Sequence, residues 1–290
     1  MESRYGRRLS FGVFPVPNAD ELELIRSLVG RADALGLDVI GIQDHPYQRR
    51  YVEMFELIAD LMARTERVRF FTDVANLPLR GPAMIAKNAA TLDVLSGGRF
   101  ELGLGAGAFW EGIAAMGGPV RAPRAALESL EEAIRIIRLF WSGDRSIAFE
   151  GQHYTVKGLH PGPPPAHPIE IWLGVGKPRS LALTGRLADG WVASSGWAKP
   201  HLVPEMMSRI DEAAVAHGRE PTEIRRLLNV SGRIADGAVE EPLHGPPEHW
   251  IETLTSFVQD LGFDTFVFWP AEEPEEQLER FASEVAPALR

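Results

Sequence analysis

The chemically active side chains of this sequence gather at the ends of segments rich in β-forming residues. Asp44 and His45 directly follow one such segment, and His45 is the one histidine at a clear strand end. An imidazole titrates near neutral pH, so His45 is the candidate catalytic residue, suited to donate a proton or to polarise a substrate. Asp44 is a candidate ligand-binding residue, although it can equally cap the turn that follows.

Two other segment ends are rich in glycine. The run from Gly103 to Gly107 ends one strand, where glycine lets a flat ring or a phosphate approach the backbone; tight packing is the alternative. The run from Gly174 to Lys177 precedes a helix that we expect to start near Pro178, and the free N–H groups of such a start bind phosphate. A simple strand-to-helix turn is the alternative there. Together the two runs favour a phosphorylated cofactor.

The residue inventory argues against several other chemistries. The sequence has no cysteine, so disulfides, thiolate metal sites and cysteine nucleophiles are excluded. It has no His-x-His motif, so we expect no catalytic metal. A glycosidase needs two facing carboxylates at strand ends; Asp44 and Asp73 could form such a pair, but no glutamate ends a strand. An aldolase that forms a Schiff base needs a lysine in the barrel, and Lys177 lies outside a strand. The remaining glycines, serines and tryptophans suit a large planar cofactor that carries the chemistry itself.

Short β-rich runs alternate with amphipathic runs of helical length, which is typical of βα units around a parallel sheet. The expected strands are residues 9–16, 39–44, 68–76, 99–107, 169–175, 190–195, 227–234 and 265–270. The clearest helices are expected at 21–35, 52–64, 82–95, 123–141 and 275–289, with others between the later strands. Eight such units predict an α/β fold of the (β/α)8 TIM-barrel type. An open doubly wound sheet is the alternative, but that fold usually carries a glycine fingerprint after its first strand, where only Gly12 is found.

The regular spacing is interrupted once, between the fourth and fifth units. Residues 142–168 are too many for a plain connection, and we expect an insertion there. Residues 147–156 indicate a hairpin, and the proline-rich residues 161–168 indicate an extended arm. We therefore expect residues 1–290 to form a single domain.

Composition narrows the range of partners. The formal net charge is −10 over 290 residues, which argues against nucleic-acid binding. No segment approaches the roughly 20 apolar residues of a membrane span, and the N-terminus does not have the form of a signal peptide. We expect a cytoplasmic protein that acts on a small molecule.

Several stretches resemble the luciferase-like monooxygenase family. They are residues 76–107 with the run Leu-Ser-Gly-Gly-Arg-Phe, the pair Asp44-His45, the helix at 127–143, the hairpin residues 149–154, and residues 168–195 with the run Ala-Asp-Gly-Trp. The likeness covers about residues 9–200. It implies a barrel with an insertion, whose mouth binds a reduced flavin or the deazaflavin coenzyme F420. Asp44-His45 and the glycines before Lys177 look more similar to the F420 branch, and FMN is the alternative cofactor.

One position departs from the family pattern. In the deazaflavin sugar-phosphate dehydrogenases of this family, a glutamate follows the glycine at the end of strand four. Ala108 occupies that position here, so a sugar phosphate is disfavoured and an apolar substrate is favoured. A pterin-like substrate, or another carbonyl or alkene, stays open.

Three functions are compatible with the resemblance. The first is an F420-dependent oxidoreductase that moves a hydride through C5 of the deazaflavin, with His45 at the reactive edge of the ring. The others are an FMN-dependent monooxygenase that activates oxygen, and a non-catalytic flavin-binding protein. The family also implies a homodimer, formed through the helical faces within 82–95 and 126–140, although both faces can simply cover the barrel.

The resemblance further implies a bulge at the end of strand three, with a cis peptide bond between Asp73 and Val74. An ordinary strand end, in which Asp73 starts a turn, is the alternative. At the bulge, Asp73 is expected to bind a ring nitrogen if it is protonated, or a neighbouring backbone N–H if it is not.

The expected cofactor-binding residues follow strands two to five. They are Asp44, Asp73, Val74, Ala75, Gly105, Ala106, Gly107, Ala108, Gly174, Val175, Gly176 and Lys177. The glycine runs are expected at the ribityl-phosphate side, with Lys177 adding positive potential. Three tryptophans can stack on the ring or fill the barrel mouth: Trp110, Trp197 and Trp269.

Overall fold

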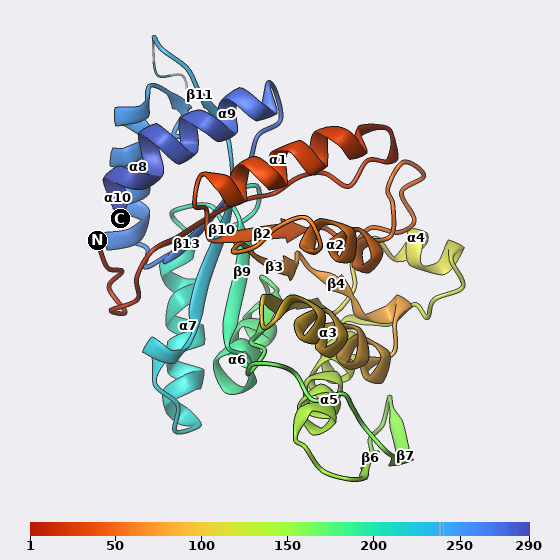
Figure 1. The fold of residues 1–290 in the computed structure, drawn as a ribbon. Helices are drawn as coiled ribbons and strands as arrows, with labels where there is room; N and C mark the ends of the chain where they lie inside the picture. The colour runs from red at the N-terminus through yellow and green to blue at the C-terminus, as the bar shows by residue number, and fades with distance from the viewer. Residues whose placement is uncertain (238, 240) are drawn as a thin grey trace.

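The structure is a computed structural model that describes residues 1–237, 239 and 241–290 (Figure 1). The barrel strands are β1 (Ser10–Val13), β2 (Val39–Ile42), β3 (Arg69–Thr72), β5 (Phe100–Gly105), β8 (Ile171–Gly174), β9 (Gly190–Ser194), β10 (Arg225–Ser231) and β13 (Thr265–Trp269). Their order is β3-β2-β1-β13-β10-β9-β8-β5, every pairing is parallel, and β3 also pairs with β5. Over the described residues this is a closed eight-stranded barrel, which confirms the (β/α)8 prediction and excludes the open sheet.

Helices connect the strands and surround the barrel (Figure 1). They are α1 (Leu22–Ala34), α2 (Met54–Met62), α3 (Pro82–Ser96), α4 (Trp110–Ala115), α5 (Pro123–Trp141), α6 (Pro178–Leu187), α7 (Val203–Ala216), α8 (Pro247–Gln259), α9 (Pro274–Arg280) and α10 (Ala286–Leu289). A π-helical turn, Phe281–Val285, joins α9 to α10. Short 3₁₀ turns lie at Ala19–Glu21, Leu77–Leu79 and Pro221–Glu223. Proline is the first residue of several helices because its missing N–H and fixed φ suit that position.

The interruption between units four and five is a hairpin. β6 (Ile147–Glu150) pairs antiparallel with β7 (Thr155–Leu159), as the sequence predicts. The proline-rich arm then returns towards the barrel, where the backbone N–H of His167 donates to Asp93 in α3. No helix within the described ranges is both long and apolar enough to cross a membrane.

Two expected strands are divided in the structure. The third becomes β3 and β4 (Ala75–Asn76), and the peptide bond between Asp73 and Val74 that separates them is cis, which confirms the predicted isomer. The seventh ends at Ser231, and β11 (Arg233–Ile234) pairs instead with β12 (His244–Gly245). Gly232 permits this turn, since a Cβ atom there would lie 2.0 Å from the carbonyl oxygen of Leu243. The short helix α4 was not expected from the sequence.

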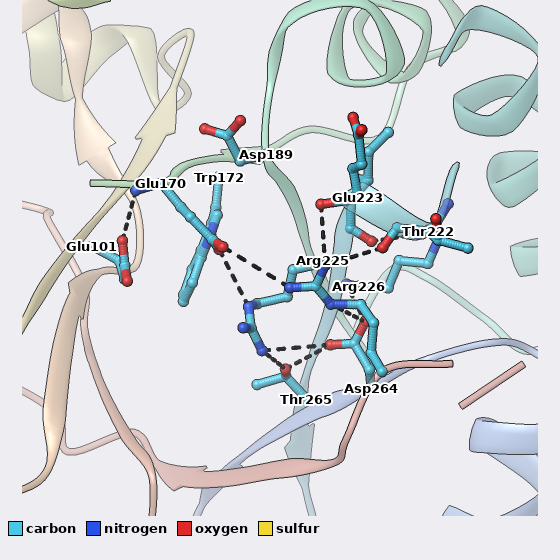
Figure 2. Close-up of polar contacts among 12 residues, drawn as sticks. Glu101, Glu170, Trp172, Asp189, Thr222, Glu223, Arg225, Arg226, Asp264 and Thr265 are labelled. Carbon is cyan, nitrogen blue, oxygen red and sulfur yellow. Dashed lines mark hydrogen bonds and ion pairs between the residues drawn. The ribbon is translucent and has the colours of Figure 1, made fainter. Parts of the chain in front are cut away.

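The interior of the barrel is apolar at its middle and charged at the end where the strands begin. The middle is filled by a buried cluster, against which Val74 packs: Phe14, Val39, Phe71, Trp172, Val192, Leu227 and Val267. Figure 2 shows the charged end, where Arg225 at the start of β10 approaches Glu170 and donates to the hydroxyl of Thr265 at 3.0 Å. This charged network lies at the end of the barrel where the strands begin.

Helices α6 and α7 pack with very little space between them at Gly185. A Cβ atom there would lie 2.2 Å from the carbonyl oxygen of Ile210. We expect Gly185→Ala to destabilise the protein by about 1–3 kcal/mol, because the two helices must move apart. Urea unfolding measures the change.

Gly30 in α1 is the matched control. It lies on an exposed helix face, and no atom of the described residues comes within 4 Å of a Cβ atom built there. Gly30→Ala should therefore stabilise the protein by up to about 1 kcal/mol. Equal effects of the two substitutions would contradict the packing described for α6 and α7.

Candidate active site

The ends of the strands surround a cavity of about 770 Å³, a size typical of small-molecule sites. It lies at the barrel end opposite the charged network, where TIM barrels carry their sites. The structure brings together at this cavity every residue that the sequence predicts for the site: Asp44, His45, Asp73, Val74, Ala75, Gly105, Ala106, Gly107, Ala108, Gly174, Val175, Gly176 and Lys177. Their separate binding roles stay predictions.

His45 lies among aromatic side chains on the cavity wall. Its Nδ1 atom is 2.6 Å from the hydroxyl of Tyr47, and its ring meets Phe109 edge-on with centroids 5.3 Å apart. Burial lowers the pKa of His45. The unperturbed pKa assumed from the sequence is therefore wrong, and the ring is uncharged at neutral pH. A neutral imidazole accepts a proton from an alcohol or donates an N–H hydrogen bond to a carbonyl.

The carboxylate of Asp44 interacts mainly with other groups of the protein. It accepts a hydrogen bond from the backbone N–H of Asn76 at 2.7 Å and forms a buried ion pair with Arg80. Burial raises the pKa of Asp44, and Arg80 opposes that shift. The pair links the end of β2 to the turn after β4, so Asp44 holds the site together whether or not it also contacts a cofactor.

The glycines at the strand ends make room for neighbouring side chains. A Cβ atom at Gly105 or Gly174 would lie 2.9 Å or 2.7 Å from a methyl carbon of Val74. A Cβ atom at Gly176 would lie 2.8 Å from the ring of Trp197. Close packing, which the sequence left as the alternative for the run that contains Gly105, also accounts for Gly174 and Gly176, where a simple turn was the alternative. The contact of these glycines with a phosphate stays a prediction.

Asp73 is buried at the inner end of the cavity, with 9% of its surface exposed. Its Oδ2 atom lies above Gly41, where a Cβ atom would be 2.9 Å away. Burial raises the pKa of Asp73 to about 7, and a hydrogen bond from the Asn229 side chain opposes the shift. The carboxyl therefore titrates close to neutral pH, unlike an exposed aspartate.

The cavity also holds residues that sequence reasoning missed. Asn229 lies inside the β-rich run Leu-Leu-Asn-Val-Ser, and that isolated amide was the available signal. Arg124 and Arg179 lie in the first turns of α5 and α6, which open onto the same end of the barrel. With Lys177 they place positive charge at the rim, which favours an anionic ligand.

The three tryptophans weighed from the sequence differ in position. Trp110 and Trp197 line the cavity, as expected for ring-stacking candidates. Trp269 packs instead against Phe14, with centroids 5.5 Å apart, and remains 42% exposed. Within the described part of the chain, no group of three or more His, Cys, Asp and Glu residues is arranged to hold a metal ion.

Comparisons with known proteins agree with this architecture. The family model of luciferase-like monooxygenases matches residues 8–240. An F420-dependent glucose-6-phosphate dehydrogenase of Intrasporangium calvum is 26% identical over 90% of this chain and 92% of its own. An F420-dependent secondary alcohol dehydrogenase in complex with an F420-acetone adduct has a TM-score of 0.87 at 16% identity, covering 98% of this chain and 99% of its own. The F420-dependent tetrahydromethanopterin reductase of Methanopyrus kandleri has a TM-score of 0.85 at 18% identity, covering 98% and 100%.

The buried pair of Asp44 and Arg80 should be required for stability. We expect Arg80→Met to destabilise the protein by about 3–5 kcal/mol, because Asp44 is left buried without its counter-ion. Asp44→Asn in the same chain should restore much of that loss, since an amide oxygen still accepts from Asn76. Chemical unfolding of the single and double variants measures the coupling.

Arg64→Met is the control, because Arg64 pairs with Asp60 on the surface. An exposed pair of this kind contributes about 1 kcal/mol or less. If Arg80→Met were no more destabilising than Arg64→Met, the anchoring role of the buried pair would be wrong.

Proposed function

This chain belongs to the luciferase-like monooxygenase family, and we propose that it is an F420-dependent oxidoreductase that transfers a hydride between the deazaflavin and a small organic substrate. The observation that carries the proposal is the cavity itself, which a neutral His45 and the cis-linked residues Asp73 and Val74 line together. F420-dependent relatives that align with about nine-tenths of the chain support the choice of cofactor.

The residues around the cavity fit such a cofactor. Val74 packs against Gly105 and Gly174, and these two positions contribute no side chains of their own to the cavity. Lys177, Arg179 and the start of α6 suit a phosphate, since cations and helix N-termini both stabilise anions. When bound, the deazaflavin supplies two-electron hydride chemistry.

The chain's own residues contribute orientation and proton transfer. His45 is fixed by its hydrogen bond to Tyr47, and in its neutral form it accepts the proton of an alcohol as the hydride leaves the carbon atom. In the reverse direction the protonated ring returns that proton to the oxygen of a carbonyl. Tyr47 and Trp110, which line the cavity, and Phe109, which is 66% exposed, form an aromatic wall near this ring. Tyr47 and Phe109 cover part of the imidazole.

The same wall indicates the substrate class. Ala108 lies at the cavity in the position where sugar-phosphate dehydrogenases of the family carry a glutamate. An alanine beside Phe109 offers no charge to a polyhydroxylated substrate. We therefore propose an alcohol or carbonyl compound with an apolar body, rather than the sugar phosphate named for the curated relatives.

The oligomeric state and the cellular location of the protein also remain proposals. On α5, the apolar residues Ala133, Ile134 and Ile137 are fully buried, which agrees with the alternative that this face covers the barrel. Helix α3 leaves Met84 58% and Leu95 75% exposed and remains the candidate surface. The homodimer and the cytoplasmic location stay predictions from the sequence.

Titration with F420 and with FMN under identical conditions tests the cofactor. We expect F420 to bind at least about tenfold more tightly, a difference of roughly 1.4 kcal/mol. Gly176→Asp should abolish binding, because it adds a negative charge and bulk at the start of α6. Gly81→Asp is the matched control: it adds the same charge at the start of α3, where no described atom lies within 4 Å of the new Cβ position.

Tighter binding of FMN, with oxygen consumption on reduction, would instead favour the monooxygenase. Unchanged F420 affinity in Gly176→Asp would reject the phosphate assignment while leaving the cofactor itself open to test. Binding of F420 without turnover of any alcohol or carbonyl compound would favour the non-catalytic flavin-binding protein.

His45→Ala tests the proton transfer. We expect kcat for oxidation of secondary alcohols to fall by about 10²–10⁴, with the Kd of F420 unchanged. Because burial lowers the pKa of His45, wild-type activity should be lost only as the pH falls below the ordinary imidazole value of about 6.5. This loss of activity at low pH should be absent from His45→Ala. Steady-state rates measured over a pH series test this expectation. Full activity of His45→Ala would exclude proton transfer by His45.

A further inference from the structure

Tyr47 lies between His45 and the short helix α4. Its hydroxyl oxygen is 2.6 Å from Nδ1 of His45. Its ring contacts α4 at Gly112, because a Cβ atom built there would lie 2.7 Å from Cγ and 2.8 Å from Cδ2 of the tyrosine. These two carbons are at the base of the ring, which cannot turn aside as the tip of a flexible side chain can. One side chain therefore joins α4 to the imidazole.

Helix α4 is held beside the cavity by close packing at both of its ends. At its start, Trp110 lines the cavity, and a Cβ atom at Gly107 would lie 2.8 Å from the tryptophan ring. Just beyond its end, a Cβ atom at Gly118 would lie 2.7 Å from a side-chain carbon of Leu79. The position of α4 is thus well defined, and its contact with the tyrosine ring is part of that packing.

Phe109, directly before α4, contacts the imidazole from another direction. Its ring meets that of His45 at an interplanar angle of 87°. The backbone N–H groups of Gly112 and Ile113 donate to the carbonyl oxygen of Phe109 at 3.0 Å and 3.2 Å. Because Phe109 belongs to the first turn of the helix, a displacement of α4 alters two contacts of the imidazole, one through Phe109 and one through Tyr47.

The contact with Tyr47 favours the protonated form of His45. Burial and the nearby carboxylate of Asp44 raise the pKa of Tyr47 to about 12, so its hydroxyl group stays neutral. A protonated imidazole carries hydrogen on both nitrogens, so its Nδ1 can only donate to the tyrosine oxygen. A hydrogen bond with one charged partner is about twice as strong as one between neutral groups. The contact therefore opposes burial, which lowers the pKa of His45.

The charged groups of the neighbouring elements have other partners or positions. After β2, Asp44 is paired with Arg80. In α4, Glu111 is exposed. Burial, and not a neighbouring charge, is the cause of the lowered pKa of His45. The other charged or titratable residues of the cavity follow β3 or lie at the starts of α5 and α6: Asp73, Arg124, Lys177 and Arg179.

We propose that Tyr47 is a positioning residue that couples the packing of α4 to the position of the His45 imidazole, and that the helix acts on it through Gly112. With α4 in place, the tyrosine hydroxyl meets Nδ1, which leaves Nε2 as the nitrogen that can react with a ligand. Any side chain at residue 112 displaces the ring that carries this hydroxyl. The effect on turnover rests on the proposed function, whereas the effect on the imidazole does not.

Nitrogen NMR of the histidine side chains in the ligand-free protein tests the coupling. A pH series gives the pKa of His45, and His45→Ala identifies its signals. We expect Tyr47→Phe, which keeps the ring but lacks the hydroxyl, to lower that pKa by about half a unit or more. Gly112→Ala keeps the hydroxyl but displaces the ring, so it should lower the same pKa.

Tyr51→Phe and Gly30→Ala are the matched controls. The hydroxyl of Tyr51 lies 3.4 Å from the side-chain nitrogen of Gln43. At Gly30, no described atom lies within 4 Å of a new Cβ atom. Both controls should leave the pKa of His45 at its wild-type value.

The two variants test separate parts of the proposal. An unchanged pKa of His45 in Tyr47→Phe would overturn the role of the hydroxyl. A higher pKa would also overturn it, because the hydroxyl would then stabilise the neutral ring. An unchanged pKa in Gly112→Ala would overturn the coupling to α4.

Tyr47→Ala decides the case in which Gly112→Ala does not fold. Replacing the ring by a methyl group makes room for the Cβ atom at residue 112, so the double variant should fold. In urea unfolding, Gly112→Ala should lower the folding equilibrium constant of the wild type at least about fivefold, and that of Tyr47→Ala much less. An equal loss in the two backgrounds, or a double variant that does not fold, would overturn the contact.

Turnover supplies the test that depends on the proposed function. We expect kcat for oxidation of secondary alcohols to fall about tenfold in Tyr47→Phe, with the Kd of F420 unchanged. Because His45 then stays neutral to lower pH, the loss of activity at low pH should also move to lower pH. A structural defect alone would lower kcat without moving that midpoint, and an unmoved midpoint would overturn the positioning role. If the wild type oxidises no alcohol and reduces no carbonyl compound, the proposed function is wrong, while the NMR titration still decides the coupling.

Discussion

The structure of the site depends on the packing of one side chain. Val74 occupies the space that Cβ atoms would need at Gly105 and Gly174, two glycines on the neighbouring strands β5 and β8. With Val74 seated there, the third strand is divided into β3 and β4, and Asp73 lies inside the barrel below it. Val74 and the Asp73 carboxyl therefore line the same cavity, next to the strands that the two glycines keep close. Glycines that suggest a phosphate site when read alone therefore have a steric role as well.

Burial then sets the charge of the cavity. Removal from water disfavours whichever form of a group is charged, so it lowers the pKa of His45 and raises that of Asp73. At physiological pH the base, His45, is therefore largely neutral, and the acid, Asp73, is near the midpoint of its titration. The cationic side chains that line the cavity, Arg124, Lys177 and Arg179, lie at the starts of α5 and α6. This separation suits a ligand that is anionic at one end and reactive at the other, which is the chemistry proposed for a deazaflavin cofactor.

The opposite end of the barrel, where the strands begin, has a structural role. There Arg225, Asp264 and Thr265 form part of a network of charged side chains (Figure 2). Burying ion pairs in this way adds less stability than their number suggests, because desolvation opposes the attraction. Function and structural support are thus divided between the two ends of the same strands.

The sequence by itself determined the architecture and the location of the site. Alternating β-rich and helical runs, prolines at the starts of helices and glycine-rich strand ends are local signals, and a parallel barrel brings all strand ends together, so every predicted site residue lies at one cavity. Only the tertiary structure decided that Asn229 and Asp73, from opposite strands, line one cavity and that His45 is neutral. It also decided the break at Gly232 and the existence of α4. These properties depend on neighbours far apart along the chain, and residue patterns within one segment carry no information about them.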